Sequence, residues 1–150
     1  MKYVALLRGI NVGGNKKVEM KKLKAAFELS GYSNVATYIN SGNVIFESVK
    51  DKDVVRREAE NLLKKEFGFE IQTLVKTEDE MRKIAEAIPT EWQNDDKQRT
   101  DVAYLFEDID SRKVITELPV NREYIDVRYV KGAILWNFDR KNYSKSRLNN

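Results

Sequence analysis

The chain has 150 residues, of which 41% are apolar and 34% charged, and this is long enough for one compact domain or two small ones. The absence of cysteine and histidine excludes disulfides, thiolate nucleophiles, Ser-His-Asp triads and most transition-metal sites. No apolar run approaches the roughly 20 residues that a membrane span needs, and the first residues lack the apolar segment of a signal peptide. We therefore expect a cytoplasmic protein that contacts no membrane and carries no metal and no cofactor.

The net charge of +3 hides a segregation of charge along the chain. Residues 1–24 carry seven Lys or Arg and one acid, and residues 127–150 carry six and one. Residues 77–126 carry seven basic and fourteen acidic side chains. If the two basic ends meet in space, they form a patch that attracts phosphate-bearing partners. The alternative is that the lysines between residues 16 and 24 are only the solvated face of a helix.

Apolar runs and amphipathic stripes in the first half of the chain predict secondary-structure elements in the order β-α-β-β-α-β. The elements are a strand over 3–7, a helix over 18–30, strands over 35–39 and 43–47, a helix over 52–66 and a strand over 71–75. The first strand has no alternation of apolar and polar residues, which predicts a central position in the sheet. Gly31 is placed to end the first helix. This order is the ferredoxin-like one, so we assign residues 1–76 to a ferredoxin-like subdomain.

The second half predicts a smaller α+β subdomain over residues 77–150, in the order α, β, α and β-hairpin. Thr77 and Glu80 have the spacing of a capping box, and they open a helix that Pro89 ends. A strand over 101–106, a short helix over 111–118 and a hairpin over 124–138 follow. The fold class is therefore α+β, and the sequence leaves open whether the two halves pack as one compact unit.

The predicted sheet of the first half raises a question about its second face. Two helices cover one face, yet the first strand has apolar side chains on both sides. We expect the second half of the chain to cover the other face, and a homodimer partner is the alternative.

The densest group of special residues follows the first predicted strand. Leu6–Gly14 reads LLRGINVGG, and Thr37–Phe46 reads TYINSGNVIF with serine, glycine and asparagine in a turn. Together with Tyr143–Asn149, these motifs resemble an uncharacterised bacterial family, domain of unknown function 1697. Longer members continue into a Thr-Arg-Asn-Trp segment, whereas this sequence stops at Asn150. The resemblance spans nearly the whole chain and implies two α+β subdomains, the first ferredoxin-like, without implying an activity.

The residue types after the first strand are those of an anion-binding site. Glycines allow positive φ and let backbone N–H groups converge on a guest, and arginine offers a two-pronged donor to phosphate or carboxylate. Neither a Walker A motif nor a GxGxxG fingerprint is present. The predicted ligand-binding residues are Arg8, Gly9, Asn11, Gly13, Gly14, Lys16, Lys17, Tyr38, Ser41 and Asn43. The alternative is a tight loop in which Arg8 pairs with a carboxylate, beside ordinary turn residues at Ser41 and Asn43.

Two further kinds of site are weaker alternatives. Tyr3 and Phe46 lie on the first and third strands, where RNA-recognition domains place stacking aromatics, but a core position suits them better. The carboxylate pairs at 95/96 and 108/110 are able to bind Mg²⁺, although acids at such positions usually cap helices or are solvated.

Three functions remain open on these grounds. The first is a binding module for a phosphate-bearing ligand, either nucleic acid or a phosphorylated small molecule. The second is an enzyme acting on a small anionic substrate between the subdomains, with Arg8 as anion clamp and Tyr38 or Lys17 in proton transfer. The third is an interaction protein that dimerises through an uncovered sheet face.

Overall fold

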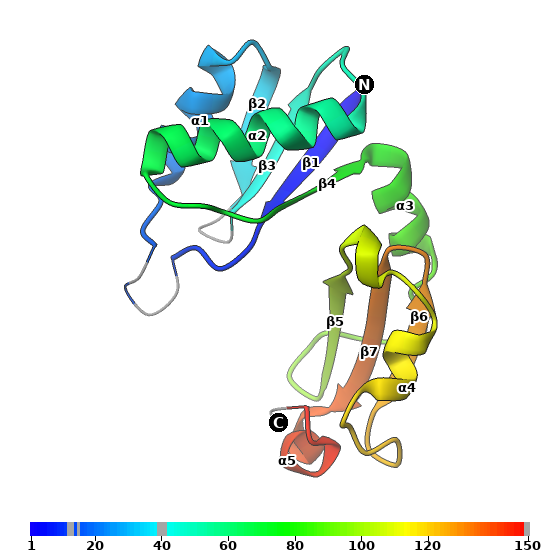
Figure 1. The fold of residues 1–150 in the computed structure, drawn as a ribbon. Coiled ribbons are helices and arrows are strands. Elements are labelled where there is room, and N and C mark those ends of the chain that lie inside the picture. The colour runs from blue at the N-terminus through cyan, green and yellow to red at the C-terminus, as the bar shows by residue number, and fades with distance from the viewer. Residues whose placement is uncertain (12–13, 15, 39–41, 149–150) are drawn as a thin grey trace. The chain divides into compact units, whose positions relative to one another are not determined.

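The described residues contain two antiparallel sheets and five α-helices, which confirms the predicted α+β class. The structure is a computed structural model that describes residues 1–11, 14, 16–38 and 42–148 (Figure 1). The chain divides into two compact units, Met1–Met81 and Arg82–Asn150.

The first unit holds a four-stranded sheet covered on one face by two helices. Its elements are β1 (Lys2–Leu7), α1 (Met20–Leu29), β2 (Ser33–Tyr38), β3 (Asn43–Glu47), α2 (Lys52–Phe67) and β4 (Thr73–Thr77). The strand order is β2-β3-β1-β4, and each neighbouring pair is antiparallel. The central position predicted for the first strand is therefore confirmed.

The two faces of β1 differ in burial. Tyr3, Ala5 and Leu7 are buried beneath the helices, whereas Val4 and Leu6 point to the other face and are half-buried. We call that second face, which neither α1 nor α2 covers, the open face of the first sheet (Figure 1). Its residues follow from the strand register, because directly paired residues of neighbouring strands share a face.

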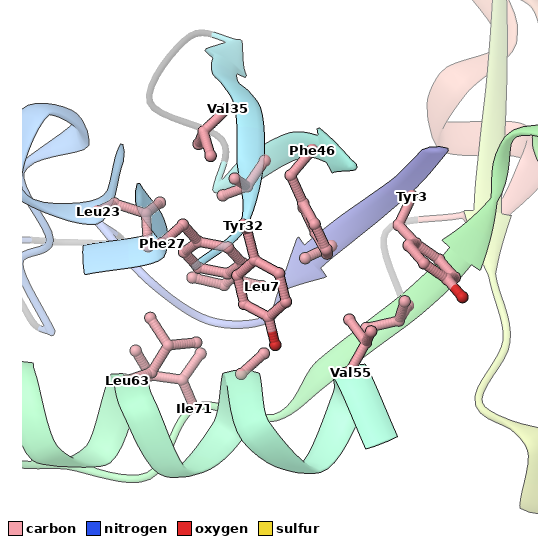
Figure 2. Close-up of a cluster of buried hydrophobic side chains, with 14 of the residues drawn as sticks. Tyr3, Leu7, Leu23, Phe27, Tyr32, Val35, Phe46, Val55, Leu63 and Ile71 are labelled. Carbon is pink, nitrogen blue, oxygen red and sulfur yellow. The ribbon is translucent and has the colours of Figure 1, made fainter. Parts of the chain in front are cut away.

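Aromatic rings form the centre of the helix-covered core. The Phe46 ring lies 5.8 Å from the ring of Tyr3, 5.2 Å from that of Phe27 and 4.9 Å from that of Tyr32, measured between centroids (Figure 2). Tyr3 and Phe46 are 1% and 0% exposed. Both side chains are core residues, as the sequence favoured.

The first helix ends where the sequence predicts, at a glycine with left-handed backbone. Gly31 has φ +93°, and its N–H donates to the Glu28 carbonyl at 3.1 Å. The N–H of Tyr32 donates to the Phe27 carbonyl at 3.3 Å. This pair of bonds is the Schellman motif, which satisfies carbonyls that the helix end would leave without partners.

The helix α3 (Glu78–Glu86) begins with the predicted capping box. The Glu80 N–H donates to the Thr77 Oγ1 at 3.1 Å, and the Thr77 N–H donates to the Glu80 Oε1 at 3.0 Å. Lys52 adds an ion pair to Glu80 at 3.2 Å. The box therefore joins the end of β4 to the first turn of α3.

Thr77→Ala should lower the free energy of unfolding by about 1 kcal/mol, because it removes the side-chain cap of α3. Urea denaturation followed by far-UV circular dichroism measures the loss. Thr90→Ala is the matched control, since Thr90 is exposed and lies outside the helices and strands. Equal midpoints for the two variants would contradict a stabilising role for the box.

The second unit holds a three-stranded sheet in the order β5-β7-β6. Its elements after α3 are β5 (Gln98–Tyr104), the 3-10 helix η2 (Glu107–Ile109), α4 (Lys113–Glu117), β6 (Asp126–Val130), β7 (Ala133–Asp139), the 3-10 helix η3 (Arg140–Asn142) and α5 (Tyr143–Ser146). The hairpin predicted at its end is confirmed, with Gly132 at φ +91° in the turn. β5 starts three residues before the predicted strand, because its ladder with β7 already begins at Gln98 and Asp139.

The basic tail has more structure than its lack of periodicity indicates. Its residues form η3 and α5, and Ser146 is fully buried. The Arg140 Nε donates to the Asp95 carbonyl at 2.7 Å, and the Lys145 ammonium lies 5.4 Å from the Tyr124 ring centroid. The tail is ordered by contacts with residues distant in the chain. Such contacts produce no apolar periodicity in the sequence of the tail itself.

Candidate functional site

The two sequence motifs meet at one end of the first sheet. The Leu7 N–H at the end of β1 donates to the Gly42 carbonyl in the turn before β3, at 3.0 Å. Gly42 has φ +80°, and a Cβ built there would lie 2.7 Å from the Ile10 Cδ1. Ile10 is buried in the core. The loop after β1 and the turn before β3 therefore pack against each other.

Arg8 extends from the end of β1 on the open face. Its backbone N–H donates to the Gln72 carbonyl at 3.0 Å, and this bond continues the pairing of β1 with β4 by one residue. The parity of the strand then places Arg8 on the same face as Leu6. The guanidinium is exposed, and its Nη1 donates to the Gln72 Oε1 at 3.4 Å.

Within the described residues, Arg8 makes no ion pair with a carboxylate. The alternative in which this arginine serves as an internal salt bridge is therefore not what the structure shows. Its weak bond to a neutral amide leaves the positive charge uncompensated by a neighbouring acid.

Tyr38 and Asn43 lie in the adjoining row of the open face. The register pairs Tyr38 with Asn43, and Asn43 with Leu6. Tyr38 is 64% exposed and Asn43 is half-buried. Three predicted residues, Arg8, Tyr38 and Asn43, are thus gathered at one end of one sheet face.

Asn11 has a different position from these three. Its Oδ1 accepts from the Val18 N–H at 2.8 Å, and its Nδ2 donates to the Val18 carbonyl at 3.1 Å. Its own N–H donates to the Lys16 carbonyl at 3.1 Å. The asparagine side chain therefore joins the start of the loop to the backbone of Val18, just before α1.

The remaining predicted residues surround the loop. Gly9 and Gly14 are exposed and have φ +71° and +79°, which fits the positive φ that glycine permits. The Lys16 ammonium lies 6.0 Å from the Phe69 ring centroid, and Lys17 is exposed. Gly13 and Ser41 fall outside the described residues.

The basic charge continues from the loop onto α1. Lys21, Lys22 and Lys24 are all exposed on this helix. The first turn of α1 contains no acidic residue. The loop and α1 therefore present a run of cations on the first unit.

Gln72 and Phe69 are neighbours of the site that sequence reasoning missed. Gln72 contacts Arg8 through a register that only the folded sheet defines, and Phe69 reaches Lys16 from the connection between α2 and β4. Neither residue belongs to a motif, so nothing in the sequence marks them.

The titratable groups with clearly shifted pKa values in the first unit lie away from this site. The Tyr32 hydroxyl donates to the Glu58 Oε2 at 2.8 Å, and burial raises the pKa of Tyr32. Hydrogen bonds from Lys50 and then Tyr32 lower the pKa of Glu58. Tyr32 and Lys50 line a pocket of about 300 Å³ that also includes Met1, at the start of β1.

Two of the four carboxylates considered for Mg²⁺, Asp95 and Asp110, hold turns by hydrogen bonds. The Asp95 Oδ1 accepts from the N–H groups of Lys97 and Gln98, and these bonds lower the pKa of Asp95. The Asp110 Oδ1 accepts from the Tyr129 hydroxyl and the Gly132 N–H. Over the described ranges, no three acidic side chains gather in a way that suits a metal ion.

Fold and site together define an α+β protein of two units, with a basic glycine loop at one end of the first sheet. Residues 1–136 match the family described as "Protein of unknown function (DUF1697)", and the chain belongs to this family. Its structure is similar to that of the conserved bacterial protein SP0830 from Streptococcus pneumoniae, with a TM-score of 0.82 and 28% sequence identity over 97% of this chain and 81% of that one. No curated protein matches the chain. In the part of the chain that the structure describes, no helix combines the length and apolar character needed to cross a membrane.

Proposed function

We propose that the first unit binds a phosphate-bearing ligand, with nucleic acid as the main class, at the end of the open face beside the glycine loop. The observation that carries the proposal is the exposed guanidinium of Arg8, which has a neutral amide as its side-chain partner and stands in the row next to Asn43 and Tyr38. A guanidinium fork suits two phosphate oxygens at once. The exposed lysines of the loop, Lys16 and Lys17, extend the positive field beside Arg8.

Such a ligand would not be held in the manner of an RNA-recognition domain. That mode requires aromatic rings on the open face of the first and third strands. Here Tyr3 and Phe46 point into the helix-covered core and are inaccessible to bases. The proposed contacts are therefore mostly to phosphate, which fixes position and carries little sequence information.

The first unit is, on the same proposal, a ferredoxin-like subdomain. What supports this is the element order β-α-β-β-α-β, the strand order β2-β3-β1-β4 and the two helices on one face. In this arrangement the loop after β1 and the turn before β3 lie at the same end of the sheet, which is where the candidate residues meet.

Arg8→Gln should weaken binding to single- or double-stranded nucleic acid and reduce the slope of log K against log salt by about 1, because one phosphate contact is lost. Fluorescence anisotropy between about 50 and 200 mM salt measures both quantities. Gln keeps much of the length of Arg8 and cannot carry its charge.

Arg57→Gln is the matched control, since it removes the same charge from an exposed position on α2, on the helix-covered side of the sheet. It should leave the slope nearly unchanged. A complete lack of binding by the unmodified protein to both kinds of nucleic acid at low salt would end the proposal. Equal effects of the two variants would show that binding depends on net charge and not on this site.

A further inference from the structure

We infer that the recognised unit is a single nucleotide, whose base stacks on Tyr38 while its phosphate lies at Arg8. This inference rests on the proposed function and narrows its ligand. A site for one nucleotide needs an exposed aromatic ring and an uncompensated cation on the same face, at a spacing that a sugar can bridge. The open face supplies both in neighbouring rows.

The spacing follows from the register of the sheet. Tyr38 on β2 and Leu6 on β1 are separated by β3, so their backbones lie about 10 Å apart at the usual spacing of about 4.8 Å between strands. Arg8 lies two residues beyond Leu6, which adds about 7 Å along β1. Both side chains are long and leave the sheet on the same face, so their ends can approach the two sides of one nucleotide.

Asn43 occupies the position between them. It is directly paired with both Tyr38 and Leu6, and it is half-buried. A carboxamide can donate to and accept from a sugar hydroxyl or a base edge. Tyr38, Asn43 and Arg8 therefore offer stacking, hydrogen bonding and charge in the order in which a nucleotide presents base, sugar and phosphate.

The number of exposed rings limits the ligand to one stacked base. On the open face, Leu6 in this row and Val4 and Ile45 in the next row of β1 and β3 are not aromatic. A strand that stacks several bases needs successive aromatic platforms along its path. One platform beside one arginine suits one nucleotide, either a free nucleoside monophosphate or the phosphorylated end of a strand.

Titration followed by amide chemical shifts in NMR spectra tests this with four probes. They are adenosine monophosphate, ribose 5-phosphate, and one short oligonucleotide with and without a 5′-phosphate. We expect the mononucleotide to bind at least about 5-fold more tightly than ribose 5-phosphate, since stacking on an aromatic ring contributes that much or more. A preference for the 5′-phosphorylated strand over the 5′-hydroxyl strand would identify a strand end as one source of the nucleotide.

Tyr38→Leu should weaken binding of the mononucleotide by about 5- to 150-fold and leave ribose 5-phosphate unaffected, whereas Tyr38→Phe should keep most of the affinity because it keeps the ring. The 64% exposure of Tyr38 makes both variants compatible with folding.

The outcomes separate the two proposals. Equal affinity for mononucleotide and ribose 5-phosphate would overturn the single-nucleotide inference and leave phosphate binding intact. Tighter binding of the 5′-hydroxyl strand than of the mononucleotide would also overturn it. If none of the four probes binds, both the inference and the proposed function fail.

Discussion

Replacing Phe46 with alanine should lower the free energy of unfolding by about 3 to 5 kcal/mol, the largest effect expected for any single substitution considered for this chain. The side chain is 0% exposed, and its ring contacts the rings of Tyr3, Phe27 and Tyr32. Truncation removes the apolar area that Phe46 buries and leaves a cavity among rigid rings, which relax poorly into the space.

Ile45→Ala is the control for this substitution. Ile45 is the preceding residue on the same strand, points to the open face and is 37% exposed, so its loss should cost much less. Urea denaturation gives both values. Far-UV circular dichroism reports the whole chain, whereas tryptophan fluorescence reports the second unit alone, because Trp92 and Trp136 both belong to it. Equal losses for Phe46→Ala and Ile45→Ala would contradict the core described here.

Replacing Gly42 with alanine should lower the free energy of unfolding by about 2 to 4 kcal/mol, because two separate costs add. The positive φ of +80° is unfavourable for any residue with a Cβ, by about 1 to 2 kcal/mol. The new Cβ would also lie 2.7 Å from the Ile10 Cδ1 and 3.1 Å from the Leu7 Cβ, which forces the core beneath the loop to move. Since Ile10 lies in the glycine loop and is buried in the core, the proposed phosphate binding should weaken as well.

Gly68→Ala separates the two reasons. Gly68 ends α2 with φ +78°, nearly the same backbone conformation, but an added Cβ there meets no atom within 4 Å. It should therefore show only the backbone cost. The difference between the two variants measures the contact of the turn with the loop, and a difference near zero would mean that Ile10 yields without cost. Denaturation midpoints and amide hydrogen exchange in β1 and β3 provide the readout.

The candidate site has a consistent physical logic. β1 ends at Leu7, and the next residue, Arg8, stands on the open face with a neutral neighbour before Gly9 turns the chain with a positive φ. The side chain of Asn11, three residues further on, bonds both the N–H and the carbonyl of Val18. Arg8 and Asn11 of one motif thus have different partners, a neutral side chain for Arg8 and the Val18 backbone for Asn11.

Features governed by neighbours in the chain could be predicted from the sequence. Gly31 ends α1 and the Thr77/Glu80 box begins α3, because capping depends on residue types within a few positions. The central strand was visible as an unbroken apolar run. The glycine loop was recognisable as an anion-site composition, although composition alone left the partner of Arg8 open.

The sequence by itself determined the class of fold, the order of the elements and the local signals that start and stop them, since these depend on periodicity and short-range sterics. The tertiary structure decided which residues share a face: it paired Arg8 with Gln72, aligned Tyr38 with Asn43, and turned Tyr3 and Phe46 into the core. Strand register and the packing of distant segments set these relations. A shift of one residue in the register would exchange the two faces of a strand, and no stretch of the sequence records that choice by itself.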